Sequence, residues 1–414
     1  MTWTPRLIGP DELDTVIDMS AFGFGVGPVA PPDYRADVGP RIEPDRTLVI
    51  DDGGRPVATA TAMSFTLATP GGSLPMAAVS EVVVLPTHRR RGMLTALLGA
   101  LADQAAERSE PVAGLTASEG GIYRRFGYGV AARFHVLRLD AWRAAEVAPL
   151  VAPDAGSVRL MGEAEARAAG VLTDVWARHW PRFPGEVDRT PGWWAGAAAD
   201  PEAIRDGASA RYLAVHEDHA GVADGYLSYR LAQGFGSGAT RHELRIAGLA
   251  AADDAVEAAL LRFAANVDLV ATVSWFGAPT DLGLRWRLAD PRTLTVAGER
   301  DQLWLRPLDV AACLAGRTYA APGGLVVEVV DDRRPTTGGR FALDGGPDGA
   351  DCARTSDEPD VVVRTAELGS LLLGGVTWTA LARAGLVDVR VAGADARADA
   401  MFRAPRAPWC GTDF

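Results

Sequence analysis

Residues 80–129 carry the pattern that decides the fold: SEVVVLPTHRRRGMLTALLGALADQAAERSEPVAGLTASEGGIYRRFGYG. The stretch opens with a β-branched run, Val82, Val83 and Val84, which is typical of a strand. A basic turn over residues 85–92 follows and ends in glycine. Apolar side chains then recur at the spacing of one helix face: Met93, Leu94, Leu97, Leu98, Leu101 and Ala105. The stretch therefore predicts a strand that enters a helix through an arginine-rich turn.

A strand, a basic turn and a helix in this order can bind a pyrophosphate. The first backbone N–H groups of a helix have no partner within the helix, and the helix dipole favours an anion beside them. Arg89, Arg90 and Arg91 precede Gly92 and can add charge-assisted hydrogen bonds. Three arginines alone would sooner indicate a solvated turn or a nucleic-acid patch. The strand before them and the apolar helix after them favour a pyrophosphate site.

The composition is that of a globular protein with more than one domain. The chain has 414 residues, of which 48% are hydrophobic and 23% charged, so we expect two or three domains. Its 53 acidic and 41 basic residues give a net charge of -12, which argues against a nucleic-acid partner. An acidic surface also attracts cationic substrates, although solubility explains the charge equally well.

No segment predicts a membrane anchor, a secretory signal or a metal site. The longest apolar candidate, residues 368–382, is interrupted by glycines and ends at Arg383. The N-terminal residues lack the apolar core of a signal peptide. Cys313, Cys352 and Cys410 lie far apart and form no CxxC pair, which makes a zinc site or a disulfide framework unexpected. We predict a cytoplasmic protein with no membrane partner.

The order of predicted elements indicates three regions, 1–144, 145–293 and 294–414. The first alternates strands and helices: a helix at 11–20, a hairpin at 47–63, a strand at 77–85, a helix at 94–108, a strand at 112–117, a short helix at 122–125 and a strand at 134–139. The second repeats part of that order: a hairpin at 211–226, a strand at 242–249 and a helix at 255–266. The third differs: strands at 303–305, 326–330 and 361–363, then helices at 366–373 and 378–384.

The second region lacks the pyrophosphate turn. Residues 250–254 join its strand to its helix and contain neither an arginine nor a glycine at the equivalent place. The carboxylates of Asp253 and Asp254 would repel a pyrophosphate. We therefore predict a duplicated fold with one cofactor site per chain.

Two motifs of the opening stretch resemble a known family. The pattern Arg89-x-x-Gly92-x-Leu94 after a strand resembles the acyl-CoA pyrophosphate loop of GNAT N-acetyltransferases. The general pattern has Gly or Ala where Leu94 stands, and family members often carry leucine there. Together with ASEGGIYRRFGYG over residues 117–129, the match resembles the Eis (enhanced intracellular survival) family.

The resemblance implies an α/β fold of mixed sheets: two tandem GNAT folds, the second degenerate, followed by a C-terminal α+β domain like sterol carrier protein. It implies acetyl-CoA as co-substrate, no metal, and transfer to primary amines of polycationic acceptors, namely aminoglycosides, basic peptides, polyamines or lysine side chains. It also implies a homo-oligomer, specifically a homohexamer. Two alternatives are a non-catalytic acyl-CoA-binding regulatory protein and a lipid carrier built on the third region.

The cofactor contacts follow from the turn and from the resemblance. The strand residues would run beside the pantetheine, and the backbone amides after the arginines would hold the phosphates. The resemblance places Ser118 near the thiol arm, and a helix N-cap is an equal alternative for its hydroxyl. The predicted contacts are Val82, Val83, Val84, Arg89, Arg90, Arg91, Gly92, Met93, Leu94 and Ser118.

Tyr123 is the predicted general acid. A phenol with a reference pKa of about 10 suits protonation of a departing thiolate. Gly120 and Gly121 precede it and let the backbone approach a cofactor. The resemblance supports the same residue, because the family's catalytic tyrosine lies in this motif. Tyr128 is the rival, and packing is the stronger explanation for it.

The resemblance implies that the α-carboxylate of the terminal Phe414 acts as the base. A C-terminal tripeptide is most often a frayed tail, but residues 404–410 are rich in proline and partly apolar, which indicates a stiff segment. A carboxylate is a weak base and would need desolvation or a relaying water. Asp413 adds a second negative charge, so we predict that the pair also binds the cationic substrate.

Three further side chains are predicted to line an amine pocket. Phe24 and Trp193 can hold an ammonium group by cation–π contact, and Glu81 can pair with it. Ordinary packing is the commoner role for any one of these residues.

Overall fold

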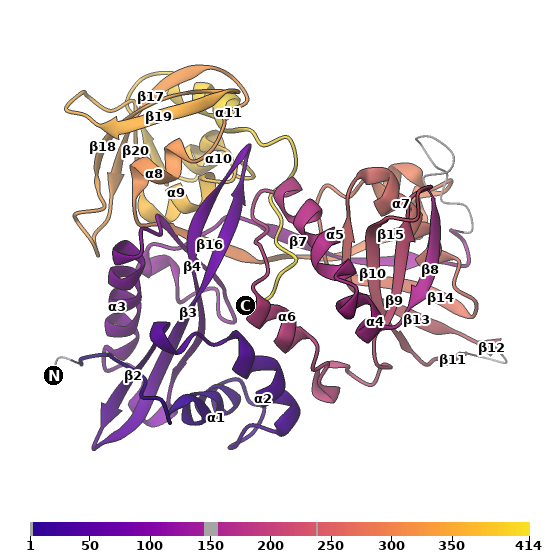
Figure 1. Cartoon of the computed structure of the whole chain (residues 1–414). Helices are drawn as coiled ribbons and strands as arrows, with labels where there is room; N and C mark the ends of the chain where they lie inside the picture. The colour runs from indigo at the N-terminus through magenta and orange to yellow at the C-terminus, as the bar shows by residue number, and fades with distance from the viewer. Residues whose placement is uncertain (1–2, 145–155, 237–238) are drawn as a thin grey trace. The chain divides into compact units, whose positions relative to one another are not determined.

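The computed structural model describes residues 3–144, 156–236 and 239–414 (Figure 1). The chain divides into two compact units, each assembled from separate stretches of sequence. The first comprises Met1–Ala132, Pro184–Pro201 and Asp301–Phe414, and the second comprises Arg133–Phe183 and Glu202–Arg300. Residues 145–155, where the first predicted boundary falls, lie outside the described residues.

The first unit contains a mixed sheet, as predicted. Its strands lie in the order β1-β2-β3-β4-β5-β16-β6, and β4 and β5 run parallel whereas the other neighbours run antiparallel. The strands are β1 (Arg6–Leu7), β2 (Thr47–Asp52), β3 (Arg55–Thr69), β4 (Gly72–Val84), β5 (Val112–Thr116), β6 (Gly129–Val130) and β16 (Leu303–Pro307).

Helices pack on both faces of this sheet. Successive residues of a strand point to opposite faces, so Val49 of β2 packs with the first helix while Leu48 and Ile50 pack with the third. The periodic apolar side chains of the third helix are buried, as their spacing predicts. The helices are α1 (Leu13–Gly23), α2 (Pro32–Val38) and α3 (Met93–Glu107).

A β-bulge in β4 opens the sheet beside β5. Thr61 pairs with Ser80 and Thr59 with Val83, so two residues of β4 oppose one of β3. Farther back, β4 pairs with β5 only from Met76 to Ala78. The two parallel strands therefore part beyond Ala78, and the polar backbone of β4 loses its neighbour there.

Two strands lie in a different sheet from the one that sequence order predicts. The strand predicted at 134–139 for the first region is β7 (Arg133–Asp140), which lies in the sheet of the second unit. The strand predicted at 303–305 for the third region is β16, which lies between β5 and β6 in the first sheet. The predicted placement of these two strands is wrong, because a strand pattern does not specify which neighbour satisfies its backbone.

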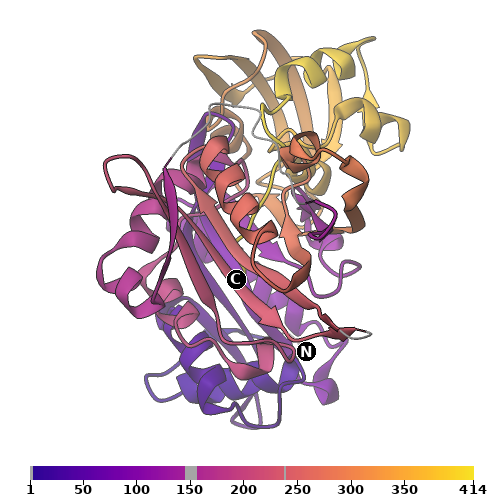
Figure 2. The same ribbon diagram turned by 90° about the vertical axis from the view of Figure 1, so that its right-hand side faces the viewer.

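The second unit repeats the central order of the first. In both, a hairpin leads to a third strand, then to a helix, then to a strand parallel to the third. The strands of this unit can be followed in Figure 2. Its sheet order is β15-β7-β14-β13-β10-β9-β8. Its elements are β8 (Ser157–Met161), α4 (Glu163–Ala168), α5 (Val171–His179), β9 (Tyr212–Glu217), β10 (Ala223–Ala232), β11 (Phe235–Gly236), β12 (Ala239–Thr240), β13 (His242–Ala251), α7 (Asp254–Ala265), β14 (Val270–Ala278) and β15 (Leu294–Asp301).

The remainder of the first unit is a five-stranded sheet in the order β19-β18-β17-β20-β21 with helices packed on it. Trp378, Tyr319 and Phe402 fill its interior and are almost wholly buried. Core packing therefore accounts for its apolar residues. The elements are α8 (Val310–Ala315), β17 (Gly323–Val330), β18 (Gly339–Gly346), β19 (Gly349–Arg354), β20 (Val361–Arg364), α9 (Thr365–Leu371), α10 (Trp378–Arg383), β21 (Val387–Val389) and α11 (Ala394–Phe402).

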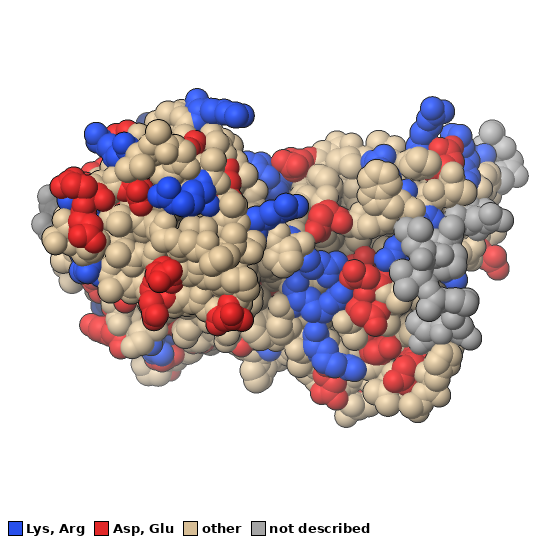
Figure 3. Space-filling view, turned by 90° about the horizontal axis from the view of Figure 1, so that it is seen from above, with Lys and Arg blue, Asp and Glu red and all other residues tan. Residues whose placement is uncertain are grey.

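Two further observations concern membrane-spanning helices and surface charge. No helix in the described parts of the chain is both long and apolar enough to cross a membrane. Acidic and basic side chains are interspersed over the face shown in Figure 3.

Candidate active site

The arginine-rich turn leaves its cationic groups and the helix start open. Arg90 and Gly92 adopt left-handed backbone angles, with φ of 63° and 89°, which turn the chain from β4 into α3. No side chain caps the first N–H groups of α3. Arg89 and Arg91 are also exposed, and within the described residues none of the three guanidinium groups pairs with a carboxylate. The turn thus presents unpaired positive charge beside a helix N-terminus, as an anion site requires.

A residue that sequence reasoning missed steadies this turn. The indole N–H of Trp3 donates to the carbonyl oxygen of Arg91 at 2.8 Å. Trp3 also packs on the core beneath α3. No local motif marks this tryptophan, because its partner lies 88 residues away.

In the second unit, a side chain of the protein itself caps the N-terminus of the equivalent helix, α7. The Asp253 carboxylate accepts the N–H groups of Ala255 at 2.8 Å and Val256 at 2.9 Å. A carboxylate of the chain therefore takes the place where a phosphate would lie. This geometry supports the prediction of one cofactor site per chain.

Calorimetric titration with CoA should accordingly give one site per chain. Replacing Arg89 with Ala should weaken binding about tenfold, because a charge-assisted hydrogen bond contributes roughly 1.5–3 kcal/mol. Arg108→Ala is the matched control, since Arg108 is an exposed arginine just after the other end of α3. Two equivalent CoA sites, or equal weakening by both variants, would contradict this assignment.

The three valines of β4 have different surroundings. Val83 is buried against α1, where a Cβ on Gly23 would come within 2.5 Å of its side chain. Val82 and Val84 are half-buried. Val82 lies in the bulge where β4 has parted from β5, so the backbone of this segment can pair with an amide-containing cofactor arm.

Tyr123 is half-buried immediately before a short 3-10 turn, Arg124–Phe126. Its ring meets that of Tyr128 edge-on, with centroids 6.1 Å apart. Burial raises the pKa of Tyr123, with a smaller contribution from the charge of Glu119. Tyr128 is only 3% exposed and burial raises its pKa to about 12. Of the two phenols, Tyr123 is the accessible one.

Ser118 is exposed in the loop that leads to Tyr123. The N-cap position of the 3-10 turn belongs to Tyr123, without a side-chain cap. Ser118 therefore does not cap the 3-10 turn, and its hydroxyl stays a candidate for a cofactor contact.

The end of the chain is anchored at the end of β5. A terminal oxygen of Phe414 accepts a hydrogen bond from the Thr116 hydroxyl at 3.0 Å. The Phe414 ring packs on Phe65, with centroids 5.5 Å apart. Figure 1 shows the C-terminal segment running down to its end beside α6 (Pro191–Ala197). The frayed-tail alternative is thus wrong, and Thr116 is a contact that no sequence pattern announced.

Trp193 and Asp413 meet in this anchor. The indole N–H of Trp193 donates to the Asp413 carbonyl at 2.9 Å, and the side chain of Gln302 donates to the Asp413 carboxylate at 3.1 Å. The guanidinium of Arg189 lies 4.0 Å from the Trp193 ring centroid. This cation already covers the ring. Trp193 therefore positions the C-terminal tail, whereas the prediction was a contact with a substrate ammonium.

Glu81 lies in the bulge of β4 with a left-handed φ of 49°. Its carboxylate accepts a hydrogen bond from the Ser20 hydroxyl, and the Tyr34 hydroxyl lies 2.8 Å from that of Ser20. Burial raises the pKa of Glu81, against the opposing charge of Arg41. Within the described residues, Glu81 forms no ion pair.

Phe24 follows α1 and is 49% exposed. It therefore lies at the surface with neighbours Phe22 and Val26, which are exposed as well. The contact with Ser20 places Glu81 against α1, and Phe24 lies just after the end of that helix.

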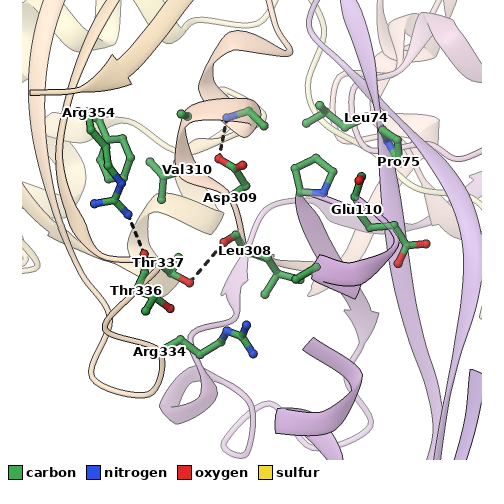
Figure 4. Close-up of a pocket in the computed structure, with 16 residues that line it drawn as sticks. Leu74, Pro75, Glu110, Leu308, Asp309, Val310, Arg334, Thr336, Thr337 and Arg354 are labelled. Carbon is green, nitrogen blue, oxygen red and sulfur yellow. Dashed lines mark hydrogen bonds between the residues drawn. The ribbon is translucent and has the colours of Figure 1, made fainter. Parts of the chain in front are cut away.

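A separate pocket of about 810 Å³ lies in the first unit (Figure 4). None of the predicted site residues lines it. Its polar side chains are engaged: Arg334 pairs with Asp103, Arg354 donates to the Thr336 carbonyl, and Thr337 donates to Leu308. Neither Tyr123 nor Phe414 lines this pocket.

Comparisons with known proteins agree with this architecture. Residues 4–131 and 185–306 each match a model described as an acetyltransferase (GNAT) domain, and residues 310–411 match a sterol carrier protein domain. The second match includes β16, and the first ends before β7.

Relatives match over the full length. An uncharacterized N-acetyltransferase of Streptomyces coelicolor is 37% identical and covers 100% of both chains. The N-acetyltransferase Eis of Mycobacterium bovis is 34% identical over 96% of this chain and 97% of its own. The crystal structure of Eis1 from Mycobacterium abscessus superposes with a TM-score of 0.85 at 35% identity and covers 100% of both chains. The chain is an N-acetyltransferase and belongs to the Eis family of GNAT proteins.

Proposed function

We propose that the enzyme transfers acetyl from acetyl-CoA directly to primary amines of polycationic acceptors, such as aminoglycosides, basic peptides, polyamines or lysine side chains. The observation that carries this proposal is the anchored terminal carboxylate of Phe414, held by Thr116 where β5 ends. Thr116 belongs to β5, the strand that has parted from β4, and the separated edge of β4 is where the pantetheine arm is predicted to run.

The proposed step moves the acetyl group from the sulfur of CoA to the nitrogen of the acceptor. The ammonium of the acceptor gives a proton to the Phe414 carboxylate, directly or through water, and the free amine attacks the thioester carbonyl carbon. The C–N bond forms, the C–S bond breaks, and the phenol of Tyr123 protonates the departing sulfur. The second proton that the nitrogen must lose to become an amide passes through water to the tyrosinate, which restores the phenol. None of these transfers needs a metal ion.

Glu81 and Asp413 supply the negative charge that a cationic acceptor requires. Glu81 is half-buried, and within the described residues its hydrogen bonds come from the hydroxyls of Ser20 and Ser80, so an incoming ammonium would be its first cationic hydrogen-bond partner. The net charge of -12 favours the approach of such acceptors. The family resemblance further supports a homohexamer, which light scattering on the purified enzyme would test.

The test is an assay with acetyl-CoA and a panel of an aminoglycoside, a polyamine and a basic peptide. Mass spectrometry should show one or more added acetyl groups on these acceptors, with release of free thiol. Thermal stabilisation by CoA without acetylation of any panel member would overturn the proposed acceptor class.

Glu81→Gln should raise the KM for the amine about tenfold, because a charge-assisted hydrogen bond is lost, with a smaller change in kcat. Since burial raises the pKa of Glu81, the wild-type amine KM should rise as pH falls through that pKa, and the variant should lack this dependence. Glu107→Gln removes an exposed charge at the end of α3 and is the control. An unchanged amine KM in Glu81→Gln would argue against its role.

A further inference from the structure

A buried carboxylate outside the predicted site holds the end of the chain. Glu186 is fully buried in the segment that precedes α6. This segment runs alongside β3: Val187 forms a bridge with Leu67, and the Ala68 N–H donates to the Glu186 carbonyl at 2.8 Å. The backbone of Glu186 is therefore fixed to the central sheet of the first unit.

The Glu186 side chain receives donors from the tail. Oε2 accepts the Gly411 N–H at 2.6 Å, and Oε1 accepts the Thr412 hydroxyl at 2.7 Å. Oε1 also accepts the N–H of Val187 at 3.0 Å, and the Cys410 thiol lies 3.7 Å from it. Both oxygens are thus occupied by groups that a charged carboxylate satisfies best.

Two more contacts continue this clamp. The Arg189 guanidinium donates to the Thr412 hydroxyl at 3.1 Å, so Thr412 accepts from one residue of the segment and donates to another. The Trp409 N–H donates to the Pro184 carbonyl at 2.9 Å. The tail is therefore held at 409, 411 and 412, immediately before its catalytic end.

We propose that Glu186 is a positioning residue for acetyl transfer: its buried carboxylate holds Gly411 and Thr412 and so sets where the Phe414 carboxylate lies. The inference rests on the proposed role of Phe414 as base. One residue separates Thr412 from Phe414, and consecutive Cα atoms are about 3.8 Å apart, so a shift at Thr412 pulls directly against the contacts that Thr116 and Phe65 make with the terminus.

A purely structural role would not require a buried carboxyl group. A buried carboxylate costs desolvation, and well-packed apolar side chains often replace such a group without loss of stability. A carboxylate that is matched to several donors instead selects one arrangement of the tail. That selection matters for catalysis, because a displacement of about 1 Å can lower a rate by about 10²-fold.

The experiment compares Glu186→Gln with Glu110→Gln in the full chain. Glu110 is also a buried carboxylate, paired with Arg46 at 2.5 Å and without contact to the tail. In Glu186→Gln one carboxylate oxygen becomes an amide N–H₂, which faces a hydrogen-bond donor of the tail and cannot accept from it. We therefore expect kcat to fall about 10- to 100-fold, with the KM for acetyl-CoA within about twofold. Glu110→Gln should keep kcat within about twofold at temperatures below its melting point.

Two further readouts separate positioning from general loss of structure. Carboxypeptidase should release Phe414 faster from Glu186→Gln than from wild type or from Glu110→Gln, because the tail is less well held. In a chain lacking Phe414, Glu186→Gln should cause no additional loss of kcat, since its effect passes through the missing carboxylate. Independent, multiplicative losses would overturn the inference.

A gentler variant protects the test if Glu186→Gln does not fold. Thr412→Val removes the hydroxyl between Arg189 and Glu186 but keeps the buried charge. It should lower kcat about three- to tenfold, consistent with one lost hydrogen bond, and should also speed release of Phe414. If the chain lacking Phe414 stays active, the proposed base and this inference both fail. If that chain is inactive while Glu186→Gln and Thr412→Val are fully active, this inference alone fails.

Discussion

Deleting Phe414 should lower kcat by about 10²-fold or more while acetyl-CoA affinity stays within about twofold, because general-base help contributes roughly 10²- to 10⁴-fold. The shortened chain ends at Asp413, whose α-carboxylate lies about one Cα spacing, or 3.8 Å, farther back. The hydrogen bond from Thr116 and the contact with Phe65 are lost together. The cofactor turn at residues 89–92 is untouched. Steady-state kinetics with both substrates varied would measure the effect.

Two related chains separate the carboxylate from the ring. Adding one glycine after Phe414 keeps the ring but converts the carboxylate into an amide, so kcat should fall as in the deletion. Phe414→Ala keeps a terminal carboxylate but loses packing on Phe65, so its loss should be smaller. An unchanged kcat in the extended chain would remove the terminal carboxylate from the mechanism.

Tyr123→Phe should lower kcat by about 10²- to 10⁴-fold, because the phenol is the proton source for the leaving thiolate. The ring and its edge-on contact with Tyr128 are kept, so acetyl-CoA affinity should change little. Burial raises the pKa of Tyr123, so its phenol is protonated at neutral pH and below. The wild-type kcat should therefore fall only in alkaline solution, above the ordinary phenol value of about 10, and this limb should be absent in the variant.

Tyr128→Phe is the matched control for Tyr123→Phe. Tyr128 carries the same group five residues later but is buried, so its removal should affect stability more than kcat. Equal losses of kcat in the two variants would reopen the choice of acid. A parallel loss of CoA binding in Tyr123→Phe, measured by calorimetry, would make Tyr123 a structural residue.

Local sequence patterns correctly predicted the strands and the helix around the cofactor turn at residues 89–92. The apolar spacing after Gly92 predicted a helix at 94–108, and α3 spans Met93–Glu107. The hairpin at 47–63 is β2 and β3, because turn residues and strand propensity act over a few neighbouring positions. The paired aspartates at 253–254 also predicted correctly that the second helix start would differ, since a cap is a local interaction.

The residues proposed to bind the acceptor and to act as base depend on contacts between residues that lie far apart in the sequence. The partner of Thr116 lies 298 residues away, and the partners of Glu186 in the tail lie more than 220 residues away. Nothing in the local pattern around residue 81 announced the bulge that buries Glu81 beside Ser20. The contacts of Trp193 with Arg189 and Asp413 likewise form only in the folded chain, and its contact with a substrate ammonium stays a prediction.

By itself the sequence determined the arginine-rich turn, the helix behind it, the accessible tyrosine motif and the family, because each is written in a few adjacent residues. Only the tertiary structure decided which strands share a sheet: β16 lies in the first sheet and β7 in the second. It also decided that the C-terminus lies beside Thr116 and Phe65. The physical reason is the same in both cases. Backbone pairing and the burial of Glu186 are satisfied by distant groups, and chain order does not specify those groups.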